Sequence, residues 1–155
     1  MDLIPSFSVD HTKIVPGIFI SRQDSVGGEI VTTYDVRVTR PNIEPAVDVA
    51  AMHSLEHIIA TFLRNDPEWK DEVIYWGPMG CLTGFYLLIR NADHTRVQKE
   101  IQMVLKNIIA FEGEIYGASE VECGNYRFHN LEGAKKAAEA FGRVMENPAA
   151  LVYPI

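Results

Sequence analysis

Two histidines spaced four residues apart are the feature that most constrains this chain. His53 and His57 lie in a run over 46–65 whose apolar residues recur at helical spacing, so both rings project from one helix face. That spacing lets two imidazoles bind one metal ion. Glu56 stands between them, where a carboxylate can reach the open side of a metal as a general base without being a ligand. The pattern therefore predicts a metal site on this helix.

A third ligand has to come from another part of the chain. Cys123 is the best candidate, because one thiolate and two imidazoles leave a fourth metal position open for chemistry. His11, His94 and His129 compete with it, and His94 is the weakest competitor because it falls in a predicted helix cap. Without any third ligand, the pair on the helix would be ordinary histidines of an amphipathic helix.

The remaining cysteine, Cys81, lies in a short, tight loop over 77–81 that contains two glycines, Gly77 and Gly80. Two cysteines are too few for a disulfide framework, and a single bond between Cys81 and Cys123 is the alternative to two free thiols. A thiol in such a loop is either reactive or a small buried hydrophobe. The sequence leaves both interpretations of Cys81 open.

Strand-like and helix-like runs alternate along the chain. Strands are predicted over 14–21, 30–39, 73–76 and 82–89, and helices over 46–65, about 93–111 and about 130–147. Gly27-Gly28 between the first two strands predicts a β-hairpin. The order predicts an α+β fold, a single two-layer domain over residues 1–155 with helices packed on one face of an antiparallel sheet. The metal-binding helix is expected at the centre of the helical layer.

Arg37 lies on the polar side of the alternating strand over 30–39. The apolar side of that strand carries Ile30, Thr32, Tyr34, Val36 and Val38. A solvated cation and an anion-binding side chain are both compatible with this position of Arg37.

Composition narrows the classes of partner. The chain has 155 residues, of which 47% are hydrophobic and 23% charged, a balance typical of soluble globular domains. A formal net charge of −7 without a basic cluster argues against nucleic acid and anionic membrane surfaces as partners. No signal peptide and no apolar run of ~20 residues is visible, so a cytoplasmic location without membrane association is expected.

Five motifs resemble, in the same order, those of the S-ribosylhomocysteine lyase family of bacterial autoinducer-2 synthesis. They are Ser6-Phe7 with Asp10-His11, Tyr34-Asp35-Val36-Arg37 with Pro41-Asn42, His53-Ser54-Leu55-Glu56-His57, Pro78-Met79-Gly80-Cys81-Leu82-Thr83-Gly84, and Cys123-Gly124 followed by Leu131-Glu132-Gly133-Ala134. The resemblance covers nearly the whole chain. It implies cleavage of S-ribosylhomocysteine to homocysteine and 4,5-dihydroxypentane-2,3-dione, the precursor of a bacterial quorum-sensing signal.

The resemblance also implies roles for the metal ligands and the acid–base groups. His53, His57 and Cys123 would hold one iron(II) ion per subunit, which zinc or cobalt can replace. Glu56 and Cys81 would shuttle protons while a carbonyl migrates along the opened ribose, before β-elimination releases homocysteine.

Substrate contacts follow from the same resemblance. Ser6, His11 and Arg37 match family residues around the ribose, and Phe7 and Arg64 match those near the homocysteine end. Several family members carry an acidic residue before the Pro-Met-Gly-Cys loop, where this chain has the run 75–77, Tyr-Trp-Gly. If that acid grips the substrate's ammonium group, another residue has to do so here.

The family is a homodimer with active sites at the subunit interface. In this chain Phe7, Trp69, Tyr75 and Trp76 are large apolar groups near predicted site elements. They belong either to such an interface or to the core of the monomer, where aromatic residues usually lie.

Two other functions are compatible with the residues alone. The pattern His-x-x-Glu-His is also the motif of inverzincin metallopeptidases. Their third ligand, however, is a glutamate on a helix, and their catalytic domains are larger than this chain. The last possibility is a non-catalytic metal-binding domain, which the open metal position and Glu56 disfavour.

Overall fold

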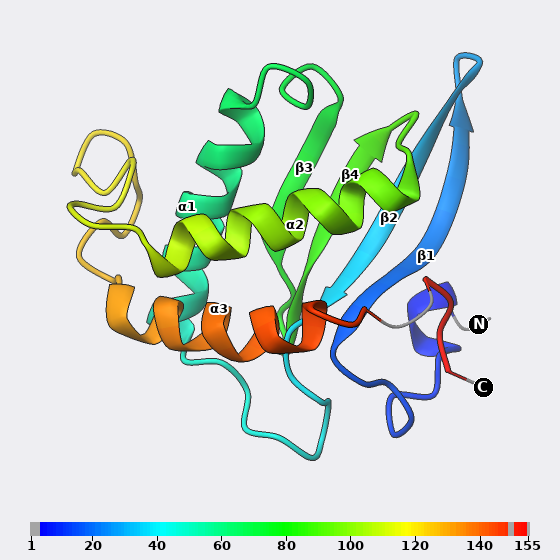
Figure 1. The fold of residues 1–155 in the computed structure, drawn as a ribbon, viewed down its shortest axis with the longest axis horizontal. Coiled ribbons are helices and arrows are strands. Elements are labelled where there is room, and N and C mark those ends of the chain that lie inside the picture. The colour runs from blue at the N-terminus through cyan, green and yellow to red at the C-terminus, as the bar shows by residue number, and fades with distance from the viewer. Residues whose placement is uncertain (1–3, 149–150, 155) are drawn as a thin grey trace.

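The computed structural model of the protein describes residues 4–148 and 151–154. Its elements along the chain are η1 (Pro5–Phe7), β1 (Gly17–Val26), β2 (Glu29–Arg37), α1 (Val49–Asn65), β3 (Val73–Pro78), β4 (Gly84–Arg90), α2 (His94–Ile109) and α3 (Leu131–Met145). This is the predicted α+β class, with the predicted strands and helices in the predicted order (Figure 1).

The four strands form one antiparallel sheet in the order β1-β2-β4-β3. β1 and β2 pair as the predicted hairpin, and Gly27 and Gly28 turn the chain with φ of 59° and 87°, angles that glycine adopts without strain. β1 is an edge strand, and its register shifts between Ile20 and Arg22 as in a β-bulge. Segment 151–154 lies along that edge, where the Ile20 N–H donates to the Leu151 carbonyl over 2.8 Å.

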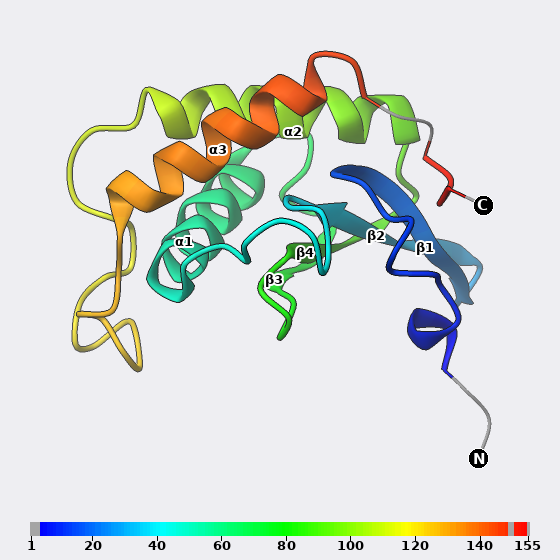
Figure 2. The same cartoon turned by 90° about the horizontal axis from the view of Figure 1, so that it is seen from below.

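Each long helix begins at a side-chain cap. Asp48, Asp93 and Asn130 each accept a hydrogen bond from the backbone N–H three residues later. α2 and α3 begin one residue after the predicted starts at about 93 and about 130, and α1 begins three residues after the predicted start at 46. The apolar residues of the three helices form one core with the sheet, and the view from below shows the helices gathered on one side of it (Figure 2).

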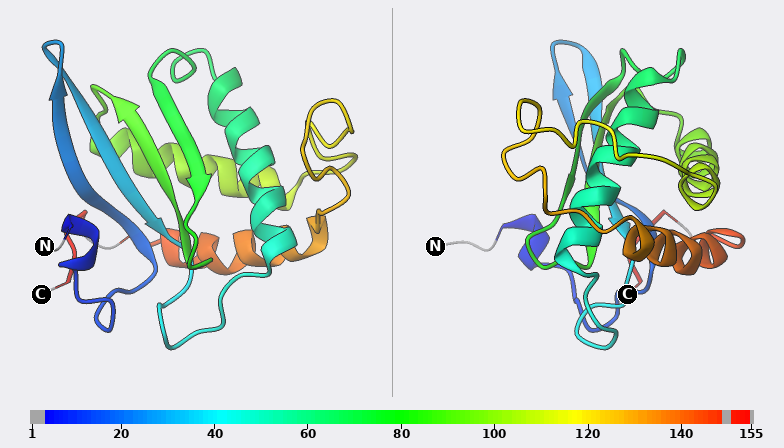
Figure 3. Two further views of the ribbon diagram at one scale, coloured as in Figure 1. Left: turned by 180° about the vertical axis from the view of Figure 1, so that it is seen from behind. Right: turned by 90° about the vertical axis from the view of Figure 1, so that its left-hand side faces the viewer.

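α1 does not occupy the centre of the helical layer, so that expectation is wrong. Figure 3 shows α1 running beside the edge strand β3, while α2 and α3 cross the sheet. One side of α1 packs on the core through residues such as Leu55 and Ile59, and the opposite side remains available for a site.

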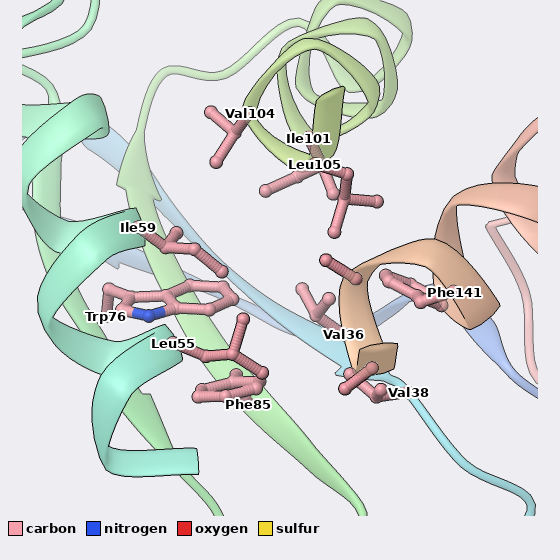
Figure 4. Close-up of a pocket in the computed structure, with 12 residues that line it drawn as sticks. Val36, Val38, Leu55, Ile59, Trp76, Phe85, Ile101, Val104, Leu105 and Phe141 are labelled. Carbon is pink, nitrogen blue, oxygen red and sulfur yellow. The ribbon is translucent and has the colours of Figure 1, made fainter. Parts of the chain in front are cut away.

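The core between the helices and the sheet holds no room for a substrate. A small internal cavity near α1, α2 and α3 measures about 10 Å³, and only apolar and aromatic side chains line it (Figure 4). Trp76 is 5% exposed in this core and stacks on Phe85 with 4.5 Å between ring centroids. Any site for a polar substrate must therefore lie on the surface of the fold.

β2 is buried on both sides near its end, and the side turned away from the helices contributes residues to one part of that surface. Tyr34 and Val36 face the helices, as the alternation predicts. Asp35 and Arg37 on the opposite side are each only 2% exposed, so the solvated-cation interpretation of Arg37 is wrong.

Candidate metal centre and thiol site

Four potential metal ligands gather between α1 and segment 110–130. They are His53, His57, Cys123 and His129, and one ligand atom from each lies within 4.8 Å of the others. The two histidines of α1 stand one turn apart, with 4.7 Å between their ring centroids. Three imidazole nitrogens and a thiol are a donor set that suits zinc, iron(II) or cobalt.

Backbone carbonyls fix which nitrogen each α1 histidine offers. The Nδ1 of His53 lies 2.6 Å from the carbonyl oxygen of Phe128, and the Nδ1 of His57 lies 2.8 Å from that of Tyr116. A carbonyl can only accept, so each Nδ1 carries the proton and each Nε2 keeps its lone pair. This is the outer arrangement that orients metal-binding histidines, and both carbonyls come from segment 110–130.

His129 completes the cluster. Its ring stacks on His53 with 4.0 Å between centroids, and its Nδ1 lies 3.3 Å from the Ser54 hydroxyl, which itself donates to the Ala50 carbonyl. Its Nε2 is buried and has no hydrogen-bond partner in the described structure. Burial, with His53 and His57 nearby, lowers the pKa of His129 to about 4, so the ring is a neutral donor at neutral pH. The residues present therefore fit a bound metal.

The Cys123 thiol is held by a tight local turn. Its Sγ lies 3.4 Å from the Nε2 of His53, and the backbone N–H of Asn125 donates to that sulfur over 3.4 Å. The Cys123 N–H in turn donates to the Ser119 carbonyl. These contacts hold the Cys123 sulfur beside the ring of His53.

The other two competing histidines lie outside this cluster. The Nδ1 of His11 contacts the Val9 carbonyl over 2.9 Å, and the ring of His94 bonds the buried Tyr34 hydroxyl. Of the competitors weighed from sequence, only His129 joins the pair on α1. No local pattern singled out His129, because its position depends on how segment 110–130 folds back onto α1.

A groove opens beside the cluster. Its volume is about 650 Å³, and its lining includes His129, Tyr116, Tyr126, Glu114 and Glu122. Glu56 is half-buried on α1, three residues after His53 and directly before His57. The metal ligands, this carboxylate and the groove thus share one region of the surface.

The second thiol, Cys81, sits in the turn between β3 and β4. The turn is closed by hydrogen bonds from the Met79 N–H to the Gly84 carbonyl and from the Leu82 N–H to the Met79 carbonyl. Leu82 has a φ of 60°, an angle rarely adopted by a branched side chain and often found at functional turns. The Leu82 carbonyl accepts from the Val47 N–H, which ties the turn to the approach to α1.

Cys81 is exposed and forms no disulfide, and two polar side chains flank its sulfur. The Thr83 hydroxyl lies 3.1 Å from Sγ and the Nη1 of Arg37 lies 3.9 Å from it. Burial of the sulfur raises the pKa of Cys81, but the Thr83 hydrogen bonds and the Arg37 charge outweigh it, so the pKa lies below its usual value. The environment is that of a reactive thiol rather than a packing residue.

Arg37 is fixed by a buried ion pair. Its Nε and Nη2 donate to the two carboxylate oxygens of Asp35 over 3.1 and 2.5 Å, and its Nη1 donates to the Thr83 hydroxyl over 2.7 Å. A bidentate pair of this kind sets the plane of the guanidinium. The pair thereby aims Nη1 at the Cys81 turn.

The N-terminal candidates lie at the other end of the molecule. Both Figure 1 and Figure 2 place η1, which contains Ser6 and Phe7, beside β1, whereas α1 and segment 110–130 lie beyond β3. Phe7 is 69% exposed. Within one chain, the structure does not bring Ser6, Phe7 and His11 to the metal cluster.

Arg64 is engaged with the start of β3. It donates to the carbonyls of Val73 and Ile74 over 3.3 and 2.9 Å. Tyr75 on the same strand is 47% exposed, and its hydroxyl lies over Gly77, where an added Cβ would meet it at 1.9 Å. Of the four aromatic residues considered for an interface, Trp69 and Trp76 are therefore core residues, and Phe7 and Tyr75 are exposed.

Across residues 4–148 and 151–154, none of the helices combines the length and apolar character that crossing a membrane requires. The two cysteines are both free, as expected.

Comparison with known proteins agrees with this arrangement. The family model described as S-Ribosylhomocysteinase (LuxS) matches residues 4–149. An S-ribosylhomocysteine lyase of Phocaeicola vulgatus is 46% identical, covering 99% of this chain and 98% of the relative, and one of Desulfotalea psychrophila is 48% identical over 99% of each. One of Porphyromonas gingivalis is 46% identical over 92% of this chain and 91% of the relative. The chain belongs to the S-ribosylhomocysteinase (LuxS) family.

Proposed function

We propose that this protein is an S-ribosylhomocysteine lyase, which cleaves its substrate to homocysteine and 4,5-dihydroxypentane-2,3-dione. The observation that carries the proposal is the cluster of His53, His57 and Cys123 on a chain that also presents Cys81 as a separate, activated thiol. The relatives named as S-ribosylhomocysteine lyases match this chain along almost its whole length. No observation favours the metallopeptidase or the non-catalytic alternative.

The main requirement of this reaction is that the protein transfers protons. An unactivated thioether is cleaved only after a carbonyl has been placed β to the sulfur, so the aldehyde of the opened ribose has to migrate along the carbon chain. Each migration removes a proton from a carbon beside the carbonyl and returns one to the neighbouring position. We assign these transfers to Glu56 and Cys81, and the final elimination breaks the carbon–sulfur bond and releases homocysteine as its thiolate.

We assign the metal to His53, His57 and Cys123, as iron(II) with one ion per subunit and with zinc or cobalt as replacements. When bound, the metal supplies Lewis-acid stabilisation of the negative charge that develops on the substrate oxygens. His129 lies beside these three ligands. We infer that it supports the site and that one metal position stays open for the substrate.

We assign Arg37, Ser6 and His11 to the ribose end of the substrate. The Arg37 guanidinium is oriented by Asp35 and lies beside the Cys81 thiol, so it can hold a sugar oxygen near that acid–base group. Phe7 and Arg64 are assigned to the homocysteine end. Tyr75 belongs to the run 75–77 that stands where several family members have an acid, and it is exposed on the strand whose start Arg64 contacts.

We further propose a homodimer with its active sites at the subunit interface. The metal cluster and the N-terminal candidates lie at opposite ends of one chain, so a site that uses both needs two chains (Figure 1). The exposed side chains of Phe7 and Tyr75 are suited to such a contact. A cytoplasmic location is proposed because both thiols have to stay reduced for these roles.

The decisive test is the release of free thiol from S-ribosylhomocysteine by the purified, metal-loaded protein. We expect catalytic release by the wild type. Cys81→Ala should keep the fold and the metal, yet lose nearly all turnover, because a proton-transfer group typically contributes ~10²–10⁴-fold to rate. A metal-loaded, folded wild type that released no thiol would contradict the proposed function.

A further inference from the structure

Segment 151–154 reaches the face of the sheet where Arg37 lies. The Leu151 carbonyl accepts a hydrogen bond from β1, and the ring of Tyr153 stacks on Phe19 with 5.0 Å between centroids and 18° between planes. The Tyr153 hydroxyl then donates to Oδ2 of Asp35 over 2.9 Å. Residues far apart in sequence are thus joined by one partly buried hydrogen bond.

The Tyr153 hydroxyl is a second hydrogen-bond donor to the Asp35 carboxylate, the group that orients Arg37. Asp35 is 2% exposed, and Oδ2 accepts from both the Arg37 Nη2 and the Tyr153 hydroxyl. Burial, followed by the Asp35 charge, raises the pKa of Tyr153 well above its usual value, so the hydroxyl remains a donor at neutral pH. A neutral donor reduces the negative potential of Asp35 without competing for its role as the partner of Arg37.

The chain of contacts continues to the thiol. From Arg37, Nη1 reaches the Thr83 hydroxyl at 2.7 Å and the Cys81 sulfur at 3.9 Å. Tyr86 is the other titratable group that interacts with Asp35, Arg37 and Cys81, and burial raises its pKa, so it is neutral there. The charged groups near the Cys81 sulfur are therefore the Arg37 guanidinium and, behind it, the Asp35 carboxylate. That carboxylate accepts a hydrogen bond from Tyr153.

We propose that Tyr153 is a positioning residue for the reaction: through Asp35 and Arg37, its hydroxyl sets the orientation and charge that the Cys81 thiol experiences. The inference rests on the proposed function only in assigning proton transfer to Cys81. It makes segment 151–154 part of the active-site support rather than a passive cover on β1.

The test uses Tyr153→Phe, which keeps the ring on Phe19 and removes only the hydroxyl. The rate at which iodoacetamide alkylates Cys81 is measured from pH 6 to pH 10 in the intact protein. Trypsin releases Cys81 in the peptide 71–90 and Cys123 in the peptide 107–127, so mass spectrometry follows the two thiols separately. Val152→Ala is the matched control, because Val152 lies in the same segment and is 71% exposed.

We expect the alkylation profile of Cys81 in Tyr153→Phe to move to higher pH, with alkylation roughly threefold slower at pH values on the rising limb. The Cys123 profile and the Val152→Ala profiles should match those of the wild type. The acid limb of kcat/KM for thiol release should move in the same direction as the alkylation profile. A purely structural role would lower the fraction of active protein without moving either profile.

A Cys81 profile in Tyr153→Phe that coincides with the wild type, or moves to lower pH, overturns the proposal. Because alkylation requires no turnover, this result is independent of whether the wild type releases thiol from S-ribosylhomocysteine. Failure of the proposed function and failure of this inference are therefore separate outcomes.

Discussion

Two backbone carbonyls determine which ring nitrogen each histidine of α1 can offer to a metal ion. Because the carbonyls of Tyr116 and Phe128 occupy both Nδ1 atoms, His53 and His57 can offer only Nε2 to an ion. The orientation of the ligands therefore depends on segment 110–130 as much as on the helix that carries them. A spacing rule applied to the helix alone could not have included that dependence.

His129 allows a sharp prediction at this scale. We expect His129→Ala to retain about one metal per chain, with affinity roughly 10–100-fold weaker, as for other residues that support a metal site without being required ligands. Cys123→Ala should lose the metal, because only two of the three proposed ligands remain. Metal content after gel filtration, together with competition against a chelator, measures both. If His129→Ala lost its metal as completely as Cys123→Ala, the site would be a closed four-ligand centre.

Among single residues, Arg37 shows what the sequence could not decide. The alternation of β2 placed its side chain on the polar face, and two interpretations were equally compatible with that face. Alternation alone puts Asp35 beside Arg37, but the Thr83 hydroxyl that bonds Arg37 and the Tyr153 hydroxyl that bonds Asp35 come from distant parts of the chain, which no local pattern could bring together. The metal pair on α1, in contrast, was visible because both of its members lie on one helical turn.

At the scale of elements, β2 and β4 approach each other so closely beside the turn that carries Cys81 that only glycine fits at position 84. An added Cβ there would lie 2.5 Å from the Val36 carbonyl and 3.1 Å from the Arg37 Cα. We expect Gly84→Ala to cost ~2 kcal/mol of unfolding free energy, since the strand has to shift to admit the methyl group.

Gly80→Ala is the control within the same turn, because a Cβ at Gly80 would meet nothing within 4 Å. Urea denaturation of both variants and the wild type measures the difference. Equal destabilisation by the two substitutions would mean that the close strand approach is not the cause.

α2 carries a buried carboxylate that makes stability depend on pH. Burial, followed by the nearby Asp66 charge, raises the pKa of Glu100 above its usual value. A raised folded-state pKa means that Glu100 favours the folded state below its unfolded pKa and loses that contribution as pH rises through the folded pKa. We expect Glu100→Gln to raise the melting temperature at pH 7.5 by a few degrees, and the difference from wild type to vanish towards pH 4.

Thermal melts of the two metal-free proteins across that range check the prediction. A stabilising effect of Glu100→Gln that stayed constant with pH would trace to packing rather than to ionisation. Arg96 is the nearby cation that partly offsets the cost of the Glu100 charge.

Most elements could be predicted because their signals are local. Asp93 and Asn130 marked the starts of α2 and α3, and Gly27-Gly28 marked the hairpin turn. The place of α1 beside β3 could not be predicted, since an amphipathic pattern says which side is buried but not which neighbour buries it. Segment 110–130 has no periodic pattern, and its fold back onto α1 was equally invisible.

At the scale of the whole molecule, the separation of the candidate residues leads to a test of the proposed shared site. His57→Ala removes a metal ligand and His11→Ala removes an N-terminal contact from the opposite end of the chain. Each variant alone should have little activity. If each site combines the two ends from different chains, a mixed dimer contains one intact site, and random exchange should restore about one quarter of wild-type activity.

Mixing His53→Ala with His57→Ala is the control, since no chain in that mixture has an intact metal cluster. Thiol release after refolding each mixture, with sedimentation to confirm the dimer, gives the result. Failure of the first mixture to recover activity, with dimers present, would place each site within a single chain.

The bond between Ile20 and Leu151 has a consequence for the order in which the molecule forms. A hairpin such as β1–β2 closes over a few residues, whereas the contacts of segment 151–154 with β1 span most of the chain and close with a much larger loss of chain entropy. We therefore expect the surroundings of Asp35 and Arg37 to form late in refolding, after the β1–β2 hairpin has paired. A refolding protein should regain its helical circular-dichroism signal before Cys81 acquires its native reactivity. The delay between the two would measure how late the Tyr153–Asp35 hydrogen bond forms.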